Sequence, residues 1–386
     1  MRIEWKPEEG KEYMRVPLEP DGRGYERVHL FSEREVEAIN FALATARPLL
    51  ILGEPGTGKS QLAEAAAEKL EFAFRRRTVN AATEPEELLY DLDLVERLAE
   101  AQIAASLYPL PGKDGSADDA ALARRRELIR GELSITRFLR PGVLWEGFDP
   151  VSARERLAAI RTASTSTGGE ASVEPKDGRT KRGVVVLIDE IDKADPSVPN
   201  ALLDALGRGA FEIPGGGTIR CGHQPPLVIV TSNKERELPR AFLRRCLVLH
   251  LSLPDREGPF VELMRERAAA HLEAGKAQLA RERAAAHLGA DREQPGLALP
   301  GDPVLEEAAR LLWSDRQAAE RDRESIPGQA ELIDLAWALA RLLEDDQRRL
   351  ERLGKMSRFV FDKHGTRPSP RRKGSSVEGS PSSGST

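Results

Sequence analysis

Cysteine, aromatic residues and long hydrophobic runs are scarce in this sequence. Its 386 residues include only two cysteines, Cys221 and Cys246, and six histidines that lack the spacing of metal ligands. Two cysteines without a CxxC pair exclude a disulfide framework and suit a reducing compartment, so we expect a cytoplasmic protein. No window approaches the roughly 18 unbroken apolar residues of a membrane helix, so no membrane association is expected.

A large excess of charge of one sign is also lacking. The 58 Lys and Arg residues against 63 Asp and Glu residues give a formal net charge of -5. This balance argues against a protein whose main role is to bind nucleic acid. A composition of 40% hydrophobic and 31% charged residues is typical of a globular protein, and the length allows two or three domains.

The composition changes along the chain and suggests domain boundaries. Residues 1–27 are charged and rich in Pro and Gly, which is typical of an N-terminal arm. Apolar runs separated by helical patterns fill 28–255, and 256–350 is helical and rich in Ala, Arg, Glu and Leu. Residues 351–386 are expected to be a largely disordered tail, and the Ser-, Thr- and Gly-rich stretch 162–183 a flexible insertion.

Short apolar runs predict the strands of a buried parallel sheet. A strand, a glycine loop and a helix follow one another early in the chain, which is the opening of an α/β nucleotide-binding fold. A helix is expected to start at Ser32 with a capping box to Glu35, and a helical pattern runs from Glu84 to Gln102. A hairpin is expected within 211–221. The predicted strands are 49–52, 72–79, 184–188, 227–230 and 247–253.

The segment after the first strand fits the phosphate-loop pattern G-x-x-x-x-G-K-[ST]. Glycines let such a loop turn its backbone N–H groups toward phosphate oxygens, and the next helix adds its positive end. We expect Lys59 to reach the β- and γ-phosphates and Ser60 to place its hydroxyl on Mg²⁺. A chance match in a glycine-rich turn is disfavoured by the flanking strand and helix. The predicted nucleotide-binding residues are Gly53, Glu54, Pro55, Gly56, Thr57, Gly58, Lys59 and Ser60.

Two carboxylates, Asp189 and Glu190, follow the apolar run 184–188. The carboxyl ends of parallel strands are where α/β sheets bind ligands. We predict that Asp189 holds the Mg²⁺ shell with Ser60, and that Glu190 orients and activates the attacking water. A helix cap or a solvated turn is the alternative. Asp192 is either a surface charge or a supporting acid.

Further polar residues follow the later strands. Asn233 ends the run that starts at 227, and we predict that its amide positions the water, with an ordinary turn asparagine as the alternative. Arg244 and Arg245 precede the last predicted strand. Arginine suits phosphate because its planar fork bonds two oxygens and keeps its charge. We predict that one of this pair is a finger for phosphate in a neighbouring subunit, with solvated charge as the alternative.

Together these segments resemble an AAA+ ATPase. Gly53–Ser60, 187–194, 231–233 and 238–246 look like its Walker A, Walker B, sensor 1 and arginine-finger segments. The combination is most similar to the MoxR-type group, and the resemblance covers roughly 28–345. It implies an α/β fold, with a five-stranded parallel sheet and flanking helices followed by a small all-α lid domain.

The resemblance also implies function. ATP is the expected nucleotide, Mg²⁺ the expected metal, and ATP hydrolysis in a homo-oligomeric ring, commonly a hexamer, the expected activity. On this pattern Arg245 is the finger and Arg244 its alternative. MoxR-type ATPases are similar to chaperones and are thought to remodel or activate partner proteins, often ones with a von Willebrand factor A domain.

The lid segment departs from the family pattern. Residues 325–332 resemble sensor 2, but Gly328 and Gln329 stand where the family often has a basic residue. Either sensor 2 is weak here or another arginine, for instance Arg323, replaces it, so no sensor 2 residue is assigned.

Two other functions are consistent with the same motifs. A nucleic-acid motor or restriction-type NTPase predicts a basic pore or a DNA-binding module, and the best basic cluster, 75–77, is interpreted as a solvated strand end. A nucleotide-binding switch without turnover predicts the loss of the catalytic acid, but Glu190 is present. Phe138, Leu144 and Trp145 either touch a client in a ring pore or pack in the core, and core packing is our expectation.

Overall fold

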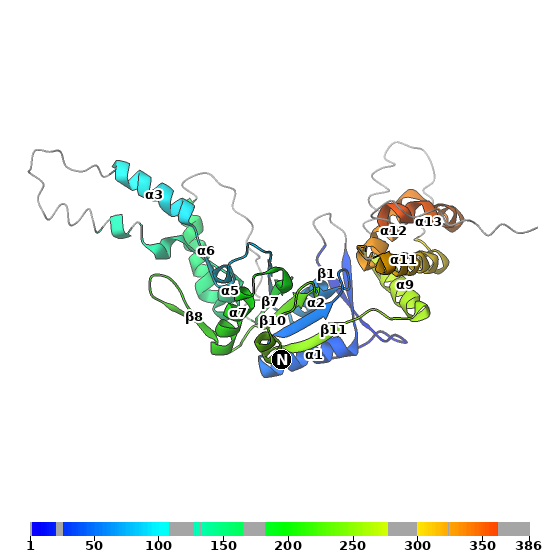
Figure 1. Cartoon of the computed structure of the whole chain (residues 1–386), viewed down its shortest axis with the longest axis horizontal. Coiled ribbons are helices and arrows are strands. Elements are labelled where there is room, and N and C mark those ends of the chain that lie inside the picture. Colours follow the sequence, from blue (N-terminus) through cyan, green and yellow to red (C-terminus); the bar gives the residue numbers. More distant parts are fainter. Residues whose placement is uncertain are drawn as a thin grey trace, which may run out of the picture. The chain divides into compact units, whose positions relative to one another are not determined.

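The computed structural model divides the chain into two compact units, Met1–Leu253 and Pro254–Thr386. Figure 1 shows the elements of each unit. The residues that the structure describes are 2–20, 26–107, 127, 129–131, 133–164, 182–276, 299–322 and 324–361.

The first unit is built on a five-stranded parallel sheet, as predicted (Figure 1). The strand order is β11-β3-β10-β7-β4, and every neighbouring pair is parallel. Strands β7 and β10 are buried along their whole length, which explains why their sequences are uninterrupted apolar runs. The strands are β3 Leu49–Gly53, β4 Ala73–Thr78, β7 Val184–Asp189, β10 Leu227–Ser232 and β11 Leu247–Leu251.

Two hydrophobic cores form because successive residues of a strand face opposite sides of the sheet. Leu49 and Ile51 pack with helices α1 and α2, whereas Leu50 belongs to the core on the other face, which includes residues of α5, α7 and α8. Helix α1 begins with the predicted capping box, in which the hydroxyl of Ser32 and the carboxylate of Glu35 each bond the other residue's backbone N–H. The helices are α1 Glu33–Thr45, α2 Lys59–Leu70, α5 Val143–Phe148, α6 Pro150–Ser164, α7 Ser197–Arg208 and α8 Arg240–Arg245.

The N-terminal residues are part of the first unit, so the prediction of an arm over 1–27 is wrong. Strand β1, Met14–Leu18, pairs antiparallel with β2, Arg27–Phe31. Met14, Val16 and Leu18 alternate along β1 and are all buried in the core that contains α1 and α2. The alternation of buried apolar residues favours a strand here, although the flanking residues are charged and rich in proline.

The helical pattern predicted from Glu84 to Gln102 is only partly correct. It contains a 3-10 turn, η1 Pro85–Leu88, a short strand β5, Tyr90–Leu92, and helix α3, Leu94–Leu107. The strand interrupts the helix because β5 pairs antiparallel with β6, Leu139–Pro141. The predicted hairpin is confirmed as β8, Ala210–Glu212, and β9, Thr218–Arg220. Residues 165–181 of the predicted insertion lie outside the described residues.

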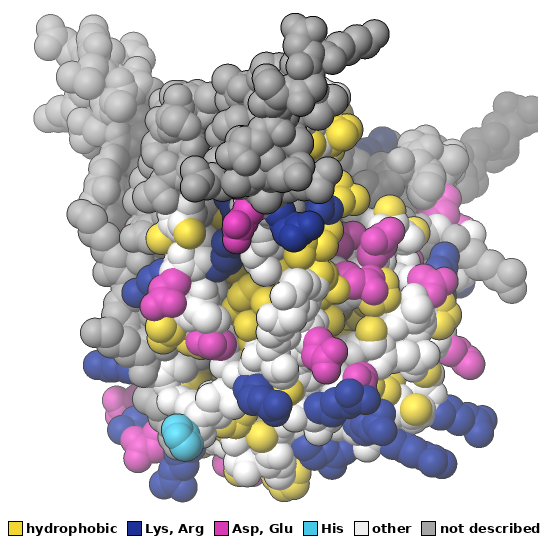
Figure 2. All heavy atoms as spheres, turned by 90° about the vertical axis from the view of Figure 1, so that its left-hand side faces the viewer, with side chains coloured by type: hydrophobic (Ala, Val, Ile, Leu, Met, Phe, Trp, Pro, Cys, Tyr) yellow, Lys and Arg dark blue, Asp and Glu magenta, His cyan; other side chains and the backbone are white. Residues whose placement is uncertain are grey.

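Helix α3 carries a set of exposed large hydrophobic side chains. Figure 2 shows the side of the molecule that carries α3, where hydrophobic side chains lie among charged side chains of both signs. A surface of this kind marks an interaction site more often than a random part of a protein. The exposed hydrophobic residues of α3 are Leu94, Val95, Leu98 and Ile103.

The second unit is all helical where it is described, in agreement with the predicted lid domain. Its helices pack around Phe260, whose ring lies 5.0 Å from that of Trp313. The tail predicted from 351 starts too early, because Leu353 and Phe361 are buried and hold the last helix in place. No helix of the described ranges is long and apolar enough to span a membrane. The helices are α9 Glu257–Ala274, α11 Asp302–Asp322, α12 Gln329–Leu342 and α13 Asp346–Phe361.

Candidate nucleotide site

The glycine loop between β3 and α2 has the tight geometry that a phosphate cradle needs. Gly58 precedes α2 with a φ of 95°, which residues with a side chain rarely adopt. Gly53 lies so close to β11 that a Cβ atom there would be 2.5 Å from the backbone oxygen of Leu251. The loop therefore depends on glycine at both positions, and it leads directly into the first turn of α2.

Lys59 lies inside this loop. Its ammonium donates hydrogen bonds to the backbone oxygens of Gly53 at 2.8 Å and Glu54 at 2.7 Å. Burial lowers the pKa of Lys59, although the nearby carboxylates, Asp189 first among them, oppose this shift. The side chain is thus a partly desolvated cation at the place where the sequence predicts phosphate binding.

Asp189 ends β7 and is the centre of a compact hydrogen-bond network. The hydroxyl of Ser60 donates to both of its carboxylate oxygens, at 2.9 and 3.0 Å, and the hydroxyl of Thr231 donates to Oδ1 at 2.5 Å. Arg76 of β4 approaches Oδ2 with Nη2 at 2.6 Å. The carboxylate is almost fully buried, so these four contacts offset the cost of its desolvation.

The residues present fit a magnesium ion bound together with a nucleotide. Mg²⁺ prefers oxygen ligands and usually takes one or two from the protein, with phosphates and water supplying the rest. Ser60 and Asp189 place a hydroxyl and a carboxylate in direct contact, and the cationic Arg76 shows that this carboxylate accommodates positive charge. The described residues contain no group of three or more His, Cys, Asp or Glu side chains that could hold a metal.

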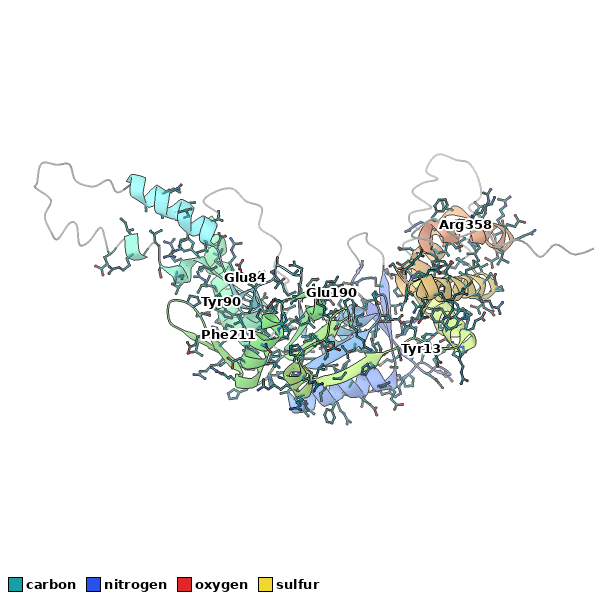
Figure 3. All side chains as sticks on the ribbon, in the orientation of Figure 1. Tyr13, Glu84, Tyr90, Glu190, Phe211 and Arg358 are labelled. Atoms are coloured by element: carbon teal, nitrogen blue, oxygen red, sulfur yellow. The ribbon has the colours of Figure 1, made fainter. Side chains whose placement is uncertain are left out.

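Glu190, labelled in Figure 3, follows β7 directly, and its backbone has an unusual conformation. Its φ of 62° lies in the left-handed region, which costs a residue with a side chain about 1–2 kcal/mol. The backbone N–H donates to Thr231 Oγ1 at 3.0 Å, which fixes this conformation. Lys193 pairs with the carboxylate at 2.8 Å, and the amide of Asn233 lies 3.5 Å from its other oxygen. The sheet thus brings the predicted acid and the predicted amide together.

Asp192, which the sequence left open, is a supporting acid. It is buried, and its carboxylate accepts hydrogen bonds from the backbone N–H of Asn233, at 3.2 and 3.3 Å, and from that of Glu235 at 2.9 Å. These bonds tie the end of β10 to the turn after β7 and so fix where Asn233 stands.

Arg244 and Arg245 are not near the phosphate loop of their own chain. They end α8, just before β11, and both are exposed. In the register of β11 with β3, Leu247 pairs with Leu49 and Leu251 with Gly53. Four residue steps of about 3.3 Å separate these pairs, so the arginines and the loop lie on opposite edges of the sheet, about 13 Å apart along the strands.

The basic cluster 75–77 is an exposed strand end, as interpreted, since Arg76 and Arg77 are exposed near the end of β4, but each of its three arginines also has a carboxylate partner. Arg75 pairs with Glu146, Arg76 with Asp189 and Arg77 with Glu87. Glu146 and Asp189 come from elements distant in the sequence, whereas Glu87 lies in the nearby turn η1. No local pattern identifies these partners.

Sequence reasoning missed three residues that shape the site. Thr231, Lys193 and Arg76 contact Asp189 or Glu190. Only Thr231 had a usable signal, since a hydroxyl at the end of a buried strand next to a carboxylate strand needs a polar partner. The aromatic and apolar residues Phe138, Leu144 and Trp145, in contrast, are buried as expected.

The segment that resembles sensor 2 starts helix α12 in the second unit. Gln329 is buried there and accepts a hydrogen bond from Arg267 of α9. The alternative residue Arg323 lies outside the described residues. The structure therefore adds no sensor 2 assignment.

Comparisons with known proteins bear on this geometry. Residues 48–108 match the family model of the AAA domain, dynein-related subfamily. A solved structure of a "putative ATPase" from Cytophaga hutchinsonii aligns over 85% of this chain and 79% of that chain, with 14% identity and a TM-score of 0.32. The comparison with curated proteins gave no match. The matched segment contains the phosphate loop. The five-stranded parallel sheet places Asp189 and Glu190 at the carboxyl end of β7, as the sequence predicts. The chain therefore has the AAA+ P-loop fold, and the match of residues 48–108 to the AAA domain supports ATPase activity.

Proposed function

We propose that this chain hydrolyses ATP in a homo-oligomeric ring and uses the energy to remodel or activate a partner protein, as MoxR-type ATPases do. The observation that carries the proposal is the contact of Ser60 with Asp189 beside the pair of Glu190 and Asn233. These groups come from three parts of the chain and meet at one edge of the sheet. Together they provide a metal ligand pair, a base and a water-positioning amide.

Each residue has a distinct role in the proposed reaction. The loop backbone, from Gly53 to Ser60, and the ammonium of Lys59 bind the β- and γ-phosphates. Ser60 and Asp189 hold Mg²⁺, which neutralises charge on the phosphate oxygens when it is bound. Glu190 orients the attacking water and takes its proton, and the amide of Asn233 holds the same water. Hydrolysis thus requires the Glu190 carboxylate to exchange its pairing with Lys193 for the water.

The position of the arginine pair supports a ring. Arg245, with Arg244 as the alternative, lies on the edge of the sheet opposite its own phosphate loop. A head-to-tail interface joins two different faces of a subunit, and its repetition closes a ring when the rotation between neighbours is a simple fraction of a full turn. The arginine of one subunit then reaches the γ-phosphate of the next. A hexamer is the ring size that the family resemblance favours.

Two features support a protein partner over a nucleic acid. The three arginines of the best basic cluster are compensated by carboxylates, and the net charge of the chain is -5. Helix α3 presents exposed hydrophobic side chains, which suit a protein surface and not a phosphate backbone. A partner with a von Willebrand factor A domain is the finer proposal, which rests on the resemblance alone.

A subunit-mixing experiment tests the shared site. Glu190→Gln keeps the arginine finger but loses its own base, whereas Arg245→Ala keeps the base but loses the finger. In an equal mixture, about one quarter of head-to-tail interfaces join an intact site to an intact finger. We expect the mixture to hydrolyse ATP although each variant alone is inactive. A mixture that is as inactive as each variant alone contradicts the shared site. The control is Glu190→Gln mixed with a chain that carries both changes, because no subunit of that mixture has the base.

A further inference from the structure

Asp189 is paired with a cation supplied by the chain itself. Of the described residues, only Arg76 forms an ion pair with Asp189, through Nη2 and Oδ2 at 2.6 Å. The carboxylate is nearly inaccessible, with 5% of its side chain exposed, while 44% of the Arg76 side chain is exposed. A buried carboxylate without a cation is costly, and Arg76 offsets part of that cost.

Arg76 also lies within reach of a second carboxylate. Its Nη1 atom is 4.0 Å from Oε1 of Glu64 on α2. Glu64 in turn pairs at 2.8 Å with Arg27, which starts β2 of the N-terminal hairpin. The guanidinium therefore stands between the proposed metal ligand and an acid that takes no part in the nucleotide site.

We propose that Arg76 is a resident counter-ion of Asp189, which competes with the Mg²⁺ of bound Mg·ATP and transfers to Glu64 when the metal arrives. This inference rests on the proposed nucleotide site. Arg76 acts through Asp189, so it is a positioning residue: it sets how much Mg²⁺ the site needs.

The competition follows from charge and space. A guanidinium at 2.6 Å occupies one of the two oxygens that face Ser60, and a divalent cation at the same carboxylate repels it. The exposed fraction of Arg76 leaves it free to turn, and Glu64 offers a second ion pair without a change of backbone. Transfer to Glu64 also makes Arg76 a competitor of Arg27 for that carboxylate, which couples site loading to the N-terminal hairpin.

The test measures the Mg²⁺ dependence of nucleotide binding, not turnover. A fluorescent ATP analogue is titrated onto the full chain at a series of Mg²⁺ concentrations, and circular dichroism verifies that each variant is folded. Arg76→Gln is expected to lower the half-saturating Mg²⁺ concentration about threefold to fivefold, the effect of one partly exposed charge pair. Arg77→Gln is the matched control, since this neighbour on β4 pairs with Glu87 instead, and it is expected to match the wild type.

A second variant tests the transfer step. Glu64→Gln removes the alternative partner of Arg76, so the half-saturating Mg²⁺ concentration is expected to rise, and Arg76→Gln in the same chain is expected to cancel that rise. An unchanged or higher Mg²⁺ requirement in Arg76→Gln overturns the inference and leaves the nucleotide site intact. If the wild-type chain binds no nucleotide with Mg²⁺, the proposed function fails, and the inference fails with it.

Discussion

Trp145 offers a quantitative test of the expectation that it packs in the core and does not contact a client. Its side chain is 4% exposed in the core of α5 and α7, and its indole N–H donates to the hydroxyl of Ser152 at 2.8 Å. A tryptophan of this kind buries about 150–250 Å², which at about 25 cal/mol per Å² corresponds to about 4–6 kcal/mol. Alanine recovers part of that burial, so Trp145→Ala is expected to reduce the free energy of unfolding by about 3–5 kcal/mol.

This loss is measurable by thermal unfolding. For a unit of this size, each kcal/mol shifts the melting temperature by about 2–4 °C, so Trp145→Ala is expected to melt about 6–20 °C below the wild type. Val95→Ala is the control, because 81% of the Val95 side chain is exposed and its loss is expected to change stability by about 0.5 kcal/mol at most. If Trp145→Ala has the melting temperature of the wild type, the core assignment is refuted and a client contact is favoured instead.

Two further predictions concern the proposed site. Burial lowers the pKa of Lys59, and phosphate binding needs its charged form, so ATP affinity is expected to weaken as the pH rises toward the ordinary lysine value of about 10.4. The unfolded chain keeps this proton to higher pH than the folded chain, so the free energy of unfolding of the nucleotide-free protein is expected to increase over the same pH range. Titrations of ATP binding and of unfolding against pH test the two opposite trends. Arg47 donates hydrogen bonds to the backbone oxygens of Arg244, Arg245 and Cys246. Arg47→Ala is therefore expected to misplace the arginine finger and to lower the rate of ATP hydrolysis about tenfold while ATP affinity stays unchanged. Arg34→Ala, at an exposed position, is the control. Weaker ATP binding by Arg47→Ala contradicts that role.

The elements that the sequence predicted well are those with local causes. The glycine loop lies between an apolar strand and a helix, and the run before Asp189 is apolar because β7 is buried on both faces of the sheet. The place of Glu190 beside Asn233 also follows, since both residues end strands that run in the same direction. These features depend on neighbours in the sequence and on one general rule of parallel sheets.

The elements that were missed depend on contacts between distant segments. Arg76 is compensated because β4 lies next to β7, a neighbourhood that only the strand order reveals. The N-terminal strand β1 exists because β2 supplies a partner and α2 a hydrophobic surface. Helix α13 extends to Phe361 because the other helices of its unit bury that ring, in a segment whose composition is otherwise typical of a tail.

The central claim is that one active site is completed by two subunits. Steady-state ATP hydrolysis per chain, measured across protein concentration for the wild type, Glu190→Gln and Arg245→Ala, tests it most directly. The account predicts that the wild-type rate per chain rises cooperatively with concentration, and that both variants bind ATP but do not turn it over. A rate per chain that is independent of concentration, with normal hydrolysis by Arg245→Ala, contradicts the ring and favours an enzyme that works as a monomer.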